Sequence, residues 1–154
     1  RFDPPLSPHY AAELGGATIE PARLVAAARA AAAGADLVVV EGVGGLMVPL
    51  TPGYLVRDLA VELGLPVVVA ARTGLGTINH TLLTVEAARA VGLRVAGVVM
   101  TPWPAVPAPI ELSNRATVER LAEVAVTGLA PTSRDRLAAA GAALPLAEWL
   151  AGGR

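Results

Sequence analysis

The sequence lacks lysine and cysteine altogether, and aromatic residues make up only 3% of it. The absence of Cys excludes disulfide bonds and thiolate metal sites, as is typical of a reducing compartment. All 12 basic side chains are Arg, which removes the amine class of catalytic residue. Any active site in this chain must therefore work without thiols and without lysine amines.

Charge and apolar runs exclude further classes. The net charge is −1 and the charged residues are scattered, so a small neutral or anionic ligand is a better partner than nucleic acid. The longest strongly apolar stretch, residues 65–71, is far shorter than the about 20 residues of a membrane helix. The first ten residues also lack the apolar segment of a signal peptide. We therefore expect a cytoplasmic protein that binds neither nucleic acid nor membrane.

Helical and strand patterns alternate along the chain. We expect helices over residues 20–34, 56–64, 77–92 and 113–124, strands over 35–42, 66–71, 94–100 and 125–130, and one or two terminal helices. The strands are almost continuously apolar, which is typical of a parallel sheet buried between helices. The sequence predicts a single α/β domain over residues 1–154, with a parallel sheet covered by helices on both faces. Trp149 and Leu150 are expected to anchor the last helix in the core.

The first predicted strand end reads EGVGG at residues 41–45, and ligands of such sheets bind beyond the carboxyl ends of strands. Burying the Glu41 carboxylate is costly unless a cation or water meets it. Glu41 is suited to hold Mg²⁺ beside phosphates, and the glycines would let the backbone approach a ligand closely. Alternatively, the glycines only form a tight turn and Glu41 is solvated.

A second strand end, ARTGLGTINH at residues 71–80, leads into a helix. Gly74 and Gly76 precede this helix, and we expect Thr77 to cap it. The unpaired N–H groups and the positive end of the helix dipole bind carboxylates or phosphates. An ordinary strand-to-helix turn is the alternative.

Three further segments have simple explanations beside functional ones. Ser7 and His9 in SPHYAA are contacts to a substrate or, more simply, a capping Ser and a surface His. Ser113 and Asn114 are good helix starters, so capping explains them. Residues GLAPTS at 128–133 end a strand and could line a base pocket.

Taken in order, SPHYAA, VVVEGVGGLMVPL, ARTGLGTINHTLLT, GVVM and SNRATVERL resemble dethiobiotin synthetase, the ATP-dependent carboxylase of biotin synthesis. The resemblance covers nearly the whole chain, and SPH-x-A-A followed by EGxGG and GxxNH is specific at these spacings. It implies a P-loop NTPase-like fold and a homodimer. It also implies that CO₂ is joined to 7,8-diaminopelargonate: one amine forms a carbamate, ATP phosphorylates it, and the second amine closes the ring.

The resemblance also implies roles for individual residues. Glu41 would bind Mg²⁺ and the nucleotide, and the substrate and phosphates would lie against Gly42, Val43, Gly44 and Gly45, of which Gly44 also contacts the nucleotide. The substrate carboxylate would be held across the dimer interface by Leu75, Gly76, Thr77, Ile78 and Asn79. The diamine end would be bordered by Ser7, Pro8 and His9, and the nucleotide base by Thr101, Gly128, Leu129, Ala130 and Pro131. Room for an interface is expected on the apolar helix face of Ile78, Leu82, Val85 and Val91.

The sequence departs from the family at two places. Thr101 follows GVVM where the family usually has an Asn that recognises adenine, and a hydroxyl cannot reproduce the paired donor and acceptor of an amide. We therefore expect ATP or another nucleoside triphosphate. The family's phosphate loop GxxxxGK[ST] and a second Lys lie upstream of SPH and are absent here. We infer that these 154 residues are the C-terminal two-thirds of a longer domain, without its innermost strand, and that alone they are inactive.

Two other functions stay open. The synthetase-like domain of a cobyrinate amidotransferase also suits EGVGG, but it would need a glutaminase domain with a catalytic Cys, and this chain has no Cys. A non-catalytic, degenerate P-loop-like subunit would pair with a partner that supplies the phosphate loop. The absence of Lys favours this binding subunit, whereas the SPHYAA segment favours the enzyme.

Overall fold

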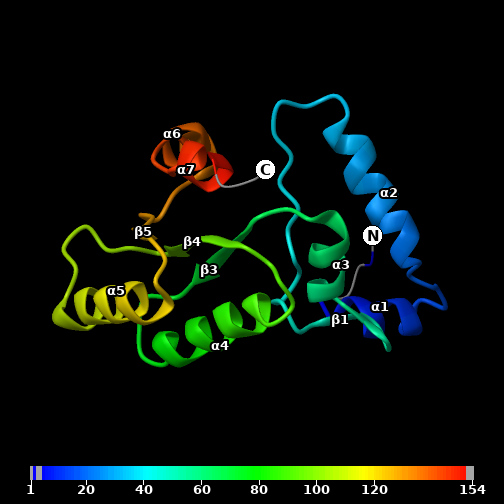
Figure 1. The fold of residues 1–154 in the computed structure, drawn as a ribbon, viewed down its shortest axis with the longest axis horizontal. Helices are drawn as coiled ribbons and strands as arrows, with labels where there is room; N and C mark the ends of the chain where they lie inside the picture. The colour runs from blue at the N-terminus through cyan, green and yellow to red at the C-terminus, as the bar shows by residue number, and fades with distance from the viewer. Residues whose placement is uncertain (1, 3–4, 152–154) are drawn as a thin grey trace. The chain divides into compact units, whose positions relative to one another are not determined.

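The computed structural model describes residue 2 and residues 5–151 of the chain. The chain divides into two compact units, Arg1–Leu65 and Pro66–Arg154, and most of their elements are labelled in Figure 1. In the part of the chain that the structure describes, no helix has the length and apolar character needed to cross a membrane.

The first unit is built from helices and a short antiparallel hairpin. Its helices are α1 (Pro8–Leu14), α2 (Pro21–Ala32) and α3 (Val56–Leu63), and its hairpin strands are β1 (Pro49–Thr51) and β2 (Tyr54–Leu55). A proline begins both α1 and α2, at a position where its missing N–H costs no hydrogen bond. The helices predicted over residues 20–34 and 56–64 are confirmed, whereas α1 and the hairpin were not predicted.

The strand predicted over residues 35–42 is wrong. Residues 37–42 form no strand, and the side chain of Val39 is 81% exposed. A strand needs a neighbour that exchanges backbone hydrogen bonds with it, and none of the described strands pairs with this segment. Apolar residues alone therefore do not hold it in a sheet, and Glu41 lies in a loop.

The second unit contains a three-stranded parallel sheet with helices on both faces. The strands β3 (Val67–Ala71), β4 (Val95–Met100) and β5 (Val126–Gly128) lie in the order β3-β4-β5. The sheet is flanked by α4 (Thr77–Arg89), α5 (Pro109–Ala122), the short 3₁₀ turn η1 (Arg134–Arg136), α6 (Leu137–Ala142) and α7 (Leu146–Ala151). Figure 1 shows α4 and α5 on one side of the sheet and α6 and α7 on the other. The predicted fold class is confirmed here.

The core of this unit lies between the sheet and helices α4 and α5. Its buried members are Val69, Val85, Val98, Met100, Val118, Ala122 and Val126. Ile78 and Leu82 of α4 pack against this cluster, so the apolar face of α4 covers its own sheet. Val85 of this face is buried, whereas Ile78, Leu82 and Val91 are only half-buried, so a dimer interface that uses this face stays a prediction.

Helix α5 begins four residues earlier than predicted, at Pro109 instead of Ser113. Two local features set this start. The fixed φ angle of a proline suits the first helical position, and the Glu111 carboxylate accepts a hydrogen bond of 2.7 Å from the Ala108 backbone N–H. Asn114 consequently lies inside the helix and does not cap it.

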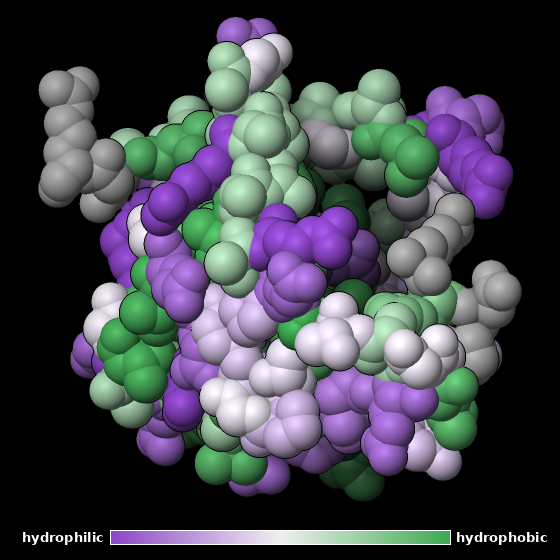
Figure 2. Space-filling view, turned by 90° about the vertical axis from the view of Figure 1, so that its right-hand side faces the viewer, coloured by the Kyte–Doolittle hydropathy of each residue, from purple (hydrophilic) through white to green (hydrophobic). Residues whose placement is uncertain are grey.

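Exposed apolar residues do not gather into one broad patch on the face shown in Figure 2, where hydrophobic residues occur in small groups among hydrophilic ones. Single exposed apolar side chains are normal on a protein surface, whereas contiguous patches indicate docking sites.

Helix α7 is attached to the sheet by Trp149. The indole lies against Gly97 of β4 and is 8% exposed, and the Arg94 guanidinium donates a hydrogen bond to the Trp149 carbonyl. Leu150, the neighbouring residue, is 51% exposed. Of the two residues expected to anchor the last helix, Trp149 is thus confirmed and Leu150 is not.

We expect Trp149→Ala to lower the free energy of unfolding by about 3 kcal/mol, since it deletes a large buried side chain. Leu150→Ala, the matched control on the same helix, should cost less than about 1 kcal/mol because that side chain is half in water. Urea unfolding followed by far-ultraviolet circular dichroism measures both. Equal losses for the two variants would contradict the assignment of Trp149 as the anchor.

Candidate functional site

The carboxyl ends of the three parallel strands meet in one row. Ala71, Met100 and Gly128 are partners in the strand register. Beyond this row, the Thr101 N–H donates to the Ala71 carbonyl at 2.9 Å, and the Leu129 N–H donates to the Met100 carbonyl at 2.9 Å. The loops that follow β3, β4 and β5 therefore lie along one edge of the sheet, where parallel sheets bind their ligands.

The loop after β3 leads into α4 through Gly76, which has a φ of 87° and occupies the N-cap position. Thr77 is the first residue of the helix, so the expectation that it caps α4 is wrong. Its side chain is 4% exposed, and its hydroxyl donates to the Arg72 carbonyl at 2.6 Å. Thr77 thus ties the loop to the helix from inside, because a buried hydroxyl needs a partner.

The first turn of α4 keeps two backbone donors open. The Thr77 N–H donates to the Gly74 carbonyl at 3.3 Å, and the His80 N–H donates to the Gly76 carbonyl at 3.2 Å. Within the described residues, the N–H groups of Ile78 and Asn79 between them donate to no carbonyl or side chain. Open N–H groups at the positive end of a helix dipole attract carboxylates and phosphates.

The tip of this loop is fully accessible. Leu75 is 95% exposed, and Gly76 and Asn79 are exposed as well, while Ile78 is half-buried. A large apolar side chain gains nothing from standing in water. The structure therefore leaves Leu75 and Asn79 free to contact a ligand or a second chain.

Sequence reasoning assigned Asn114 to helix capping and so missed its actual contacts. Its side-chain amide is buried, at 7% exposure, and donates to the carbonyls of Thr73 and Gly74 at 2.8 and 3.1 Å. The spacing contained a signal: Asn114, Val118 and Ala122 are four residues apart and form the buried stripe of α5. A polar residue in an apolar helical stripe is buried and needs partners elsewhere in the fold.

The loops after β4 and β5 are joined through Trp103. Its backbone N–H donates to the Leu129 carbonyl at 2.7 Å, and its indole lies so close to Gly128 that a Cβ there would be 2.6 Å from the ring atoms Cγ and Cδ2. The Arg115 guanidinium carbon lies 5.7 Å from the ring centre, within the range of a cation–π contact. Sequence reasoning missed both Trp103 and Arg115.

The residues predicted to surround the base are thus brought together at this edge. Thr101, Gly128 and Leu129 are half-buried, and Ala130 and Pro131 are exposed. Their backbone groups and the Thr101 hydroxyl are the polar atoms available to a base. The loop that begins α4 lies at the same edge. The predicted residues 75–79, 101 and 128–131 therefore all follow the carboxyl ends of the strands of the second unit.

In the first unit, residues 41–45 form an exposed glycine loop. Gly44 and Gly45 have φ angles of 80° and 124°, which residues with a Cβ atom rarely adopt. Among the described residues, no group of three or more His, Cys, Asp or Glu side chains could hold a metal ion. A single exposed carboxylate such as Glu41 fits Mg²⁺, which keeps several waters and uses one or two carboxylates together with substrate phosphates. The metal role of Glu41 stays a prediction.

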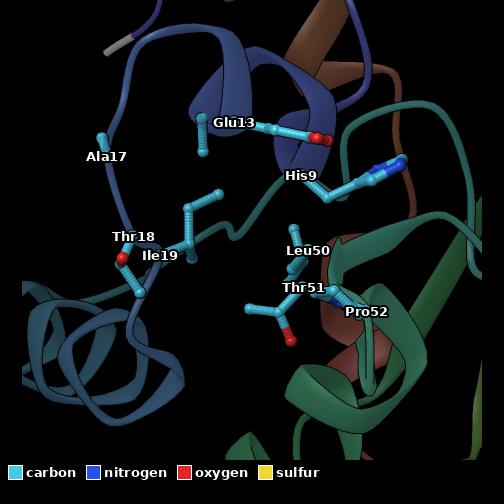
Figure 3. A pocket seen from close by; sticks show the side chains of 9 residues that line it. His9, Glu13, Ala17, Thr18, Ile19, Leu50, Thr51 and Pro52 are labelled. Carbon is cyan, nitrogen blue, oxygen red and sulfur yellow. The ribbon is translucent and has the colours of Figure 1, made fainter.

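A cavity of about 300 Å³ lies between α1 and the hairpin of the first unit. Figure 3 shows His9 and Glu13 on its α1 wall and Leu50, Thr51 and Pro52 across from them. The His9 Nδ1 atom is buried without a hydrogen-bond partner in the structure. Ser7 occupies the N-cap position of α1, but its hydroxyl makes no capping hydrogen bond, and Pro8 is the first helical residue. His9 as a whole is half-buried and lines this cavity.

Two charged groups near the hairpin act on Tyr54. Burial, followed by the charges of Glu62 and Asp58, raises the pKa of Tyr54 to about 12. Asp58 is itself fixed, since one of its oxygens accepts the Leu55 N–H at 2.8 Å and the other lies 3.5 Å from Arg57 Nε. The Tyr54 hydroxyl therefore stays neutral up to a higher pH than an ordinary tyrosine does.

The chain is similar in sequence to known proteins over most of its length. A family model described as "AAA domain" matches residues 1–137. The ATP-dependent dethiobiotin synthetase BioD of Anaeromyxobacter dehalogenans (strain 2CP-1 / ATCC BAA-258) is 49% identical over 134 residues, which are 87% of this chain and 60% of the relative. The synthetase of the same name from Mycobacterium sp. (strain KMS) is 43% identical over 161 residues, 99% of this chain and 69% of the relative. The one from Anoxybacillus flavithermus (strain DSM 21510 / WK1) is 43% identical over 82% of this chain and 58% of the relative.

The chain belongs to the dethiobiotin synthetase family. It spans about 60% of the length of the first of these relatives. The P-loop NTPase-like fold expected from the resemblance is supported by the family model, which covers both units. As a dethiobiotin synthetase family member, the chain carries its family motifs on the sheet edge and α4 of one unit and on α1 and the glycine loop of the other.

We expect Gly128→Ala to lower the free energy of unfolding by about 1–3 kcal/mol, because the new methyl group would overlap the Trp103 ring and overpack the loop. The near-ultraviolet circular dichroism of Trp103 should change with it. Gly141→Ala is the matched control, since a Cβ at Gly141 meets nothing within 4 Å and Ala favours its helix by up to about 1 kcal/mol. If Gly128→Ala behaved like Gly141→Ala, the close contact with Trp103 would be wrong.

The Tyr54 hydroxyl should ionise near pH 12, against the ordinary value of 10, in an ultraviolet titration of a Tyr10→Phe background. A pKa raised in the folded state means that this group's contribution to stability is present below pH about 10 and is lost as the pH rises towards 12. Glu62→Gln should lower the pKa of Tyr54 because it removes one of the charges that raise it. An unchanged titration in that variant would exclude Glu62 as a cause.

Proposed function

We propose that this chain carries the substrate-binding and base-binding parts of a dethiobiotin synthetase. The observation that carries this proposal is the 43–49% identity to relatives of that name over 82–99% of the chain. The reaction joins CO₂ to 7,8-diaminopelargonate in the presence of a magnesium nucleotide. One amine adds to CO₂ and loses a proton to give a carbamate, ATP transfers its γ-phosphoryl group to the carbamate oxygen, and the second amine attacks the carbonyl and expels phosphate.

The carboxylate of the substrate would bind at the start of α4, through Leu75, Gly76, Thr77, Ile78 and Asn79. The two open N–H groups of Ile78 and Asn79 and the exposed Asn79 side chain are the donors that a carboxylate requires. The exposed Leu75 would cover the aliphatic chain of the substrate. In the proposed homodimer, this helix start serves the site of the second subunit.

The diamine end would lie near Ser7, Pro8 and His9, with the glycine loop of residues 42–45 beside it. The cavity next to His9 supports this placement, since the Glu13 carboxylate on its wall attracts a protonated amine. His9 Nδ1, buried without a partner, would gain one from the bound substrate. These residues would bind and orient the amines, and a correct orientation accounts for much of the rate in such transfers.

The base of the nucleotide would lie along Thr101 and residues 128–131 of the second unit. When bound, Mg²⁺ neutralises charge on the phosphates, and Glu41 is the residue of this chain that would hold it. Thr101 offers a base one hydroxyl where an amide would offer a paired donor and acceptor. We therefore propose a relaxed choice among nucleoside triphosphates, in a cytoplasmic enzyme.

The absence of Lys favours a second candidate, a non-catalytic subunit that provides these binding sites to a partner with a phosphate loop. Without a phosphate-loop Lys, the charge developed on a transferring phosphoryl group has no amine to meet it. The two candidates share the substrate site and differ in whether the chain belongs to the same polypeptide as the phosphate loop.

The isolated 154-residue chain should bind 7,8-diaminopelargonate in calorimetry but form no dethiobiotin when ATP, Mg²⁺ and bicarbonate are added. Asn79→Ala should weaken binding roughly tenfold, which corresponds to about 1.4 kcal/mol. His80→Ala, an exposed neighbour in the same turn, should leave it unchanged. Dethiobiotin formation would show that the chain is active by itself, and an absence of substrate binding would overturn the proposed substrate site.

A further inference from the structure

The buried Asn114 amide connects two elements that are far apart in sequence. It lies in the middle of α5, yet its NH₂ group donates to Thr73 and Gly74, which are 41 and 40 residues away. An amide nitrogen has two hydrogens, and two carbonyls lie within hydrogen-bond distance of this one, at 2.8 and 3.1 Å. The bond pattern therefore joins α5 to the loop that begins α4 at two adjacent points.

Three consecutive carbonyls of this loop are held by side chains. Asn114 binds those of Thr73 and Gly74, and the Thr77 hydroxyl binds that of Arg72 at 2.6 Å. Both side chains are nearly inaccessible, at 7% and 4% exposure. Bonds shielded from water are stronger and cost more to break than exposed ones. The loop between β3 and α4 is thus fixed from the inside, while its outer side, with Leu75 at 95% exposure, is free.

Fixing these carbonyls decides where the first turn of α4 points its donors. The Gly74 carbonyl accepts both Asn114 Nδ2 and the Thr77 N–H, so the position of the helix start depends on the amide. Ile78 and Asn79 come directly after Thr77 in the helix, so the direction of their N–H groups depends on the same amide. If the loop were loose, the carbonyls of residues 72–74 could turn to these N–H groups and occupy them, because unpaired backbone groups seek partners.

We propose that Asn114, together with the Thr77 hydroxyl, is a positioning residue for carboxylate recognition. Asn114 contacts no substrate: it holds the loop of residues 72–76 so that the Ile78 and Asn79 N–H groups stay open and preorganised for a carboxylate. This inference rests on the proposed function, which places the substrate carboxylate at the start of α4. Preorganised donors bind tightly because no ordering is left to be done on binding.

The proposal requires a hydrogen-bond donor at residue 114 and at residue 77, and variants that keep or remove the donor test it. Asn114→Asp keeps the shape but presents oxygen to two carbonyl oxygens, and Asn114→Leu removes the donor. Thr77→Val removes the hydroxyl that binds Arg72, whereas Thr77→Ser keeps it. Thr84→Val is the matched control, since the Thr84 hydroxyl donates to the His80 carbonyl at 2.8 Å on the exposed side of α4 and does not touch the loop.

The test uses pelargonate, a straight-chain carboxylate, and its uncharged amide, titrated against the full chain with the amide signals of Ile78 and Asn79 followed by NMR. In the Asn114 variants and in Thr77→Val, the preference for pelargonate over its amide should fall about tenfold, and the exchange of the Thr77 amide hydrogen, which is bonded to the Gly74 carbonyl, should accelerate about tenfold. Thr84→Val should behave like the unchanged protein, and Thr77→Ser, which keeps the hydroxyl, should lose clearly less of the preference than Thr77→Val. A purely structural role would weaken both ligands equally and leave the preference intact.

The outcomes distinguish a failure of this inference from a failure of the proposed function on which it rests. If the unchanged protein prefers pelargonate and the folded variants keep that preference, the positioning role of Asn114 is excluded and the proposed site stands. If the unchanged protein binds pelargonate no better than its amide, the carboxylate site itself is wrong and the inference falls with it. Should the Asn114 variants fail to fold by circular dichroism, the Thr77→Val and Thr77→Ser pair decides between the same results.

Discussion

The parallel pairing of β4 with β3 on one side and β5 on the other is the constraint on which the candidate site of the second unit depends. Because Ala71, Met100 and Gly128 share one row of the register, the loops that follow them start at the same level. A shift of one residue would turn every side chain to the opposite face. It would move the buried Met100 and Val98 out of the core and the strand ends out of line. Core packing and site geometry therefore have a common cause.

Side chains far from any ligand then fix the loops that this register places together. Asn114 and Thr77 hold the loop after β3, and Trp103 holds the loop after β5 through its N–H and its contact with Gly128. These residues come from α5, α4 and the Pro-rich loop after β4, so each neighbouring element contributes one attachment. Such supporting contacts determine how accurately a binding group is placed.

Much of the second unit could be predicted from the sequence, because its elements agree with their local patterns. The strands over residues 67–71 and 95–100 are continuous Val-rich segments with neighbours on the sheet, and α4 ends near its predicted stop. The segment of residues 37–40 is just as apolar and forms no strand, since apolar character says nothing about whether a pairing partner is present. The predicted start of α5 is wrong for a different reason. Residues 113 and 114 are both good capping residues, but the helix starts at Pro109. Contacts such as that between Asn114 and Thr73 join residues 41 positions apart and have no local signature beyond a polar residue in an apolar stripe.

The two predicted binding loops differ in how far they are prepared for a ligand. The loop before α4 has three carbonyls held by buried side chains, whereas Glu41 to Gly44 make no hydrogen bond to any described residue. The glycine loop is held by packing instead, since a Cβ at Gly42 would lie 2.6 Å from a methyl carbon of Val56. Hydrogen bonds fix the direction of backbone groups, which packing of a glycine does not do, and donors that are already fixed lose little conformational entropy on binding. The start of α4 is therefore the better prepared of the two predicted loops for a ligand that needs aligned N–H groups.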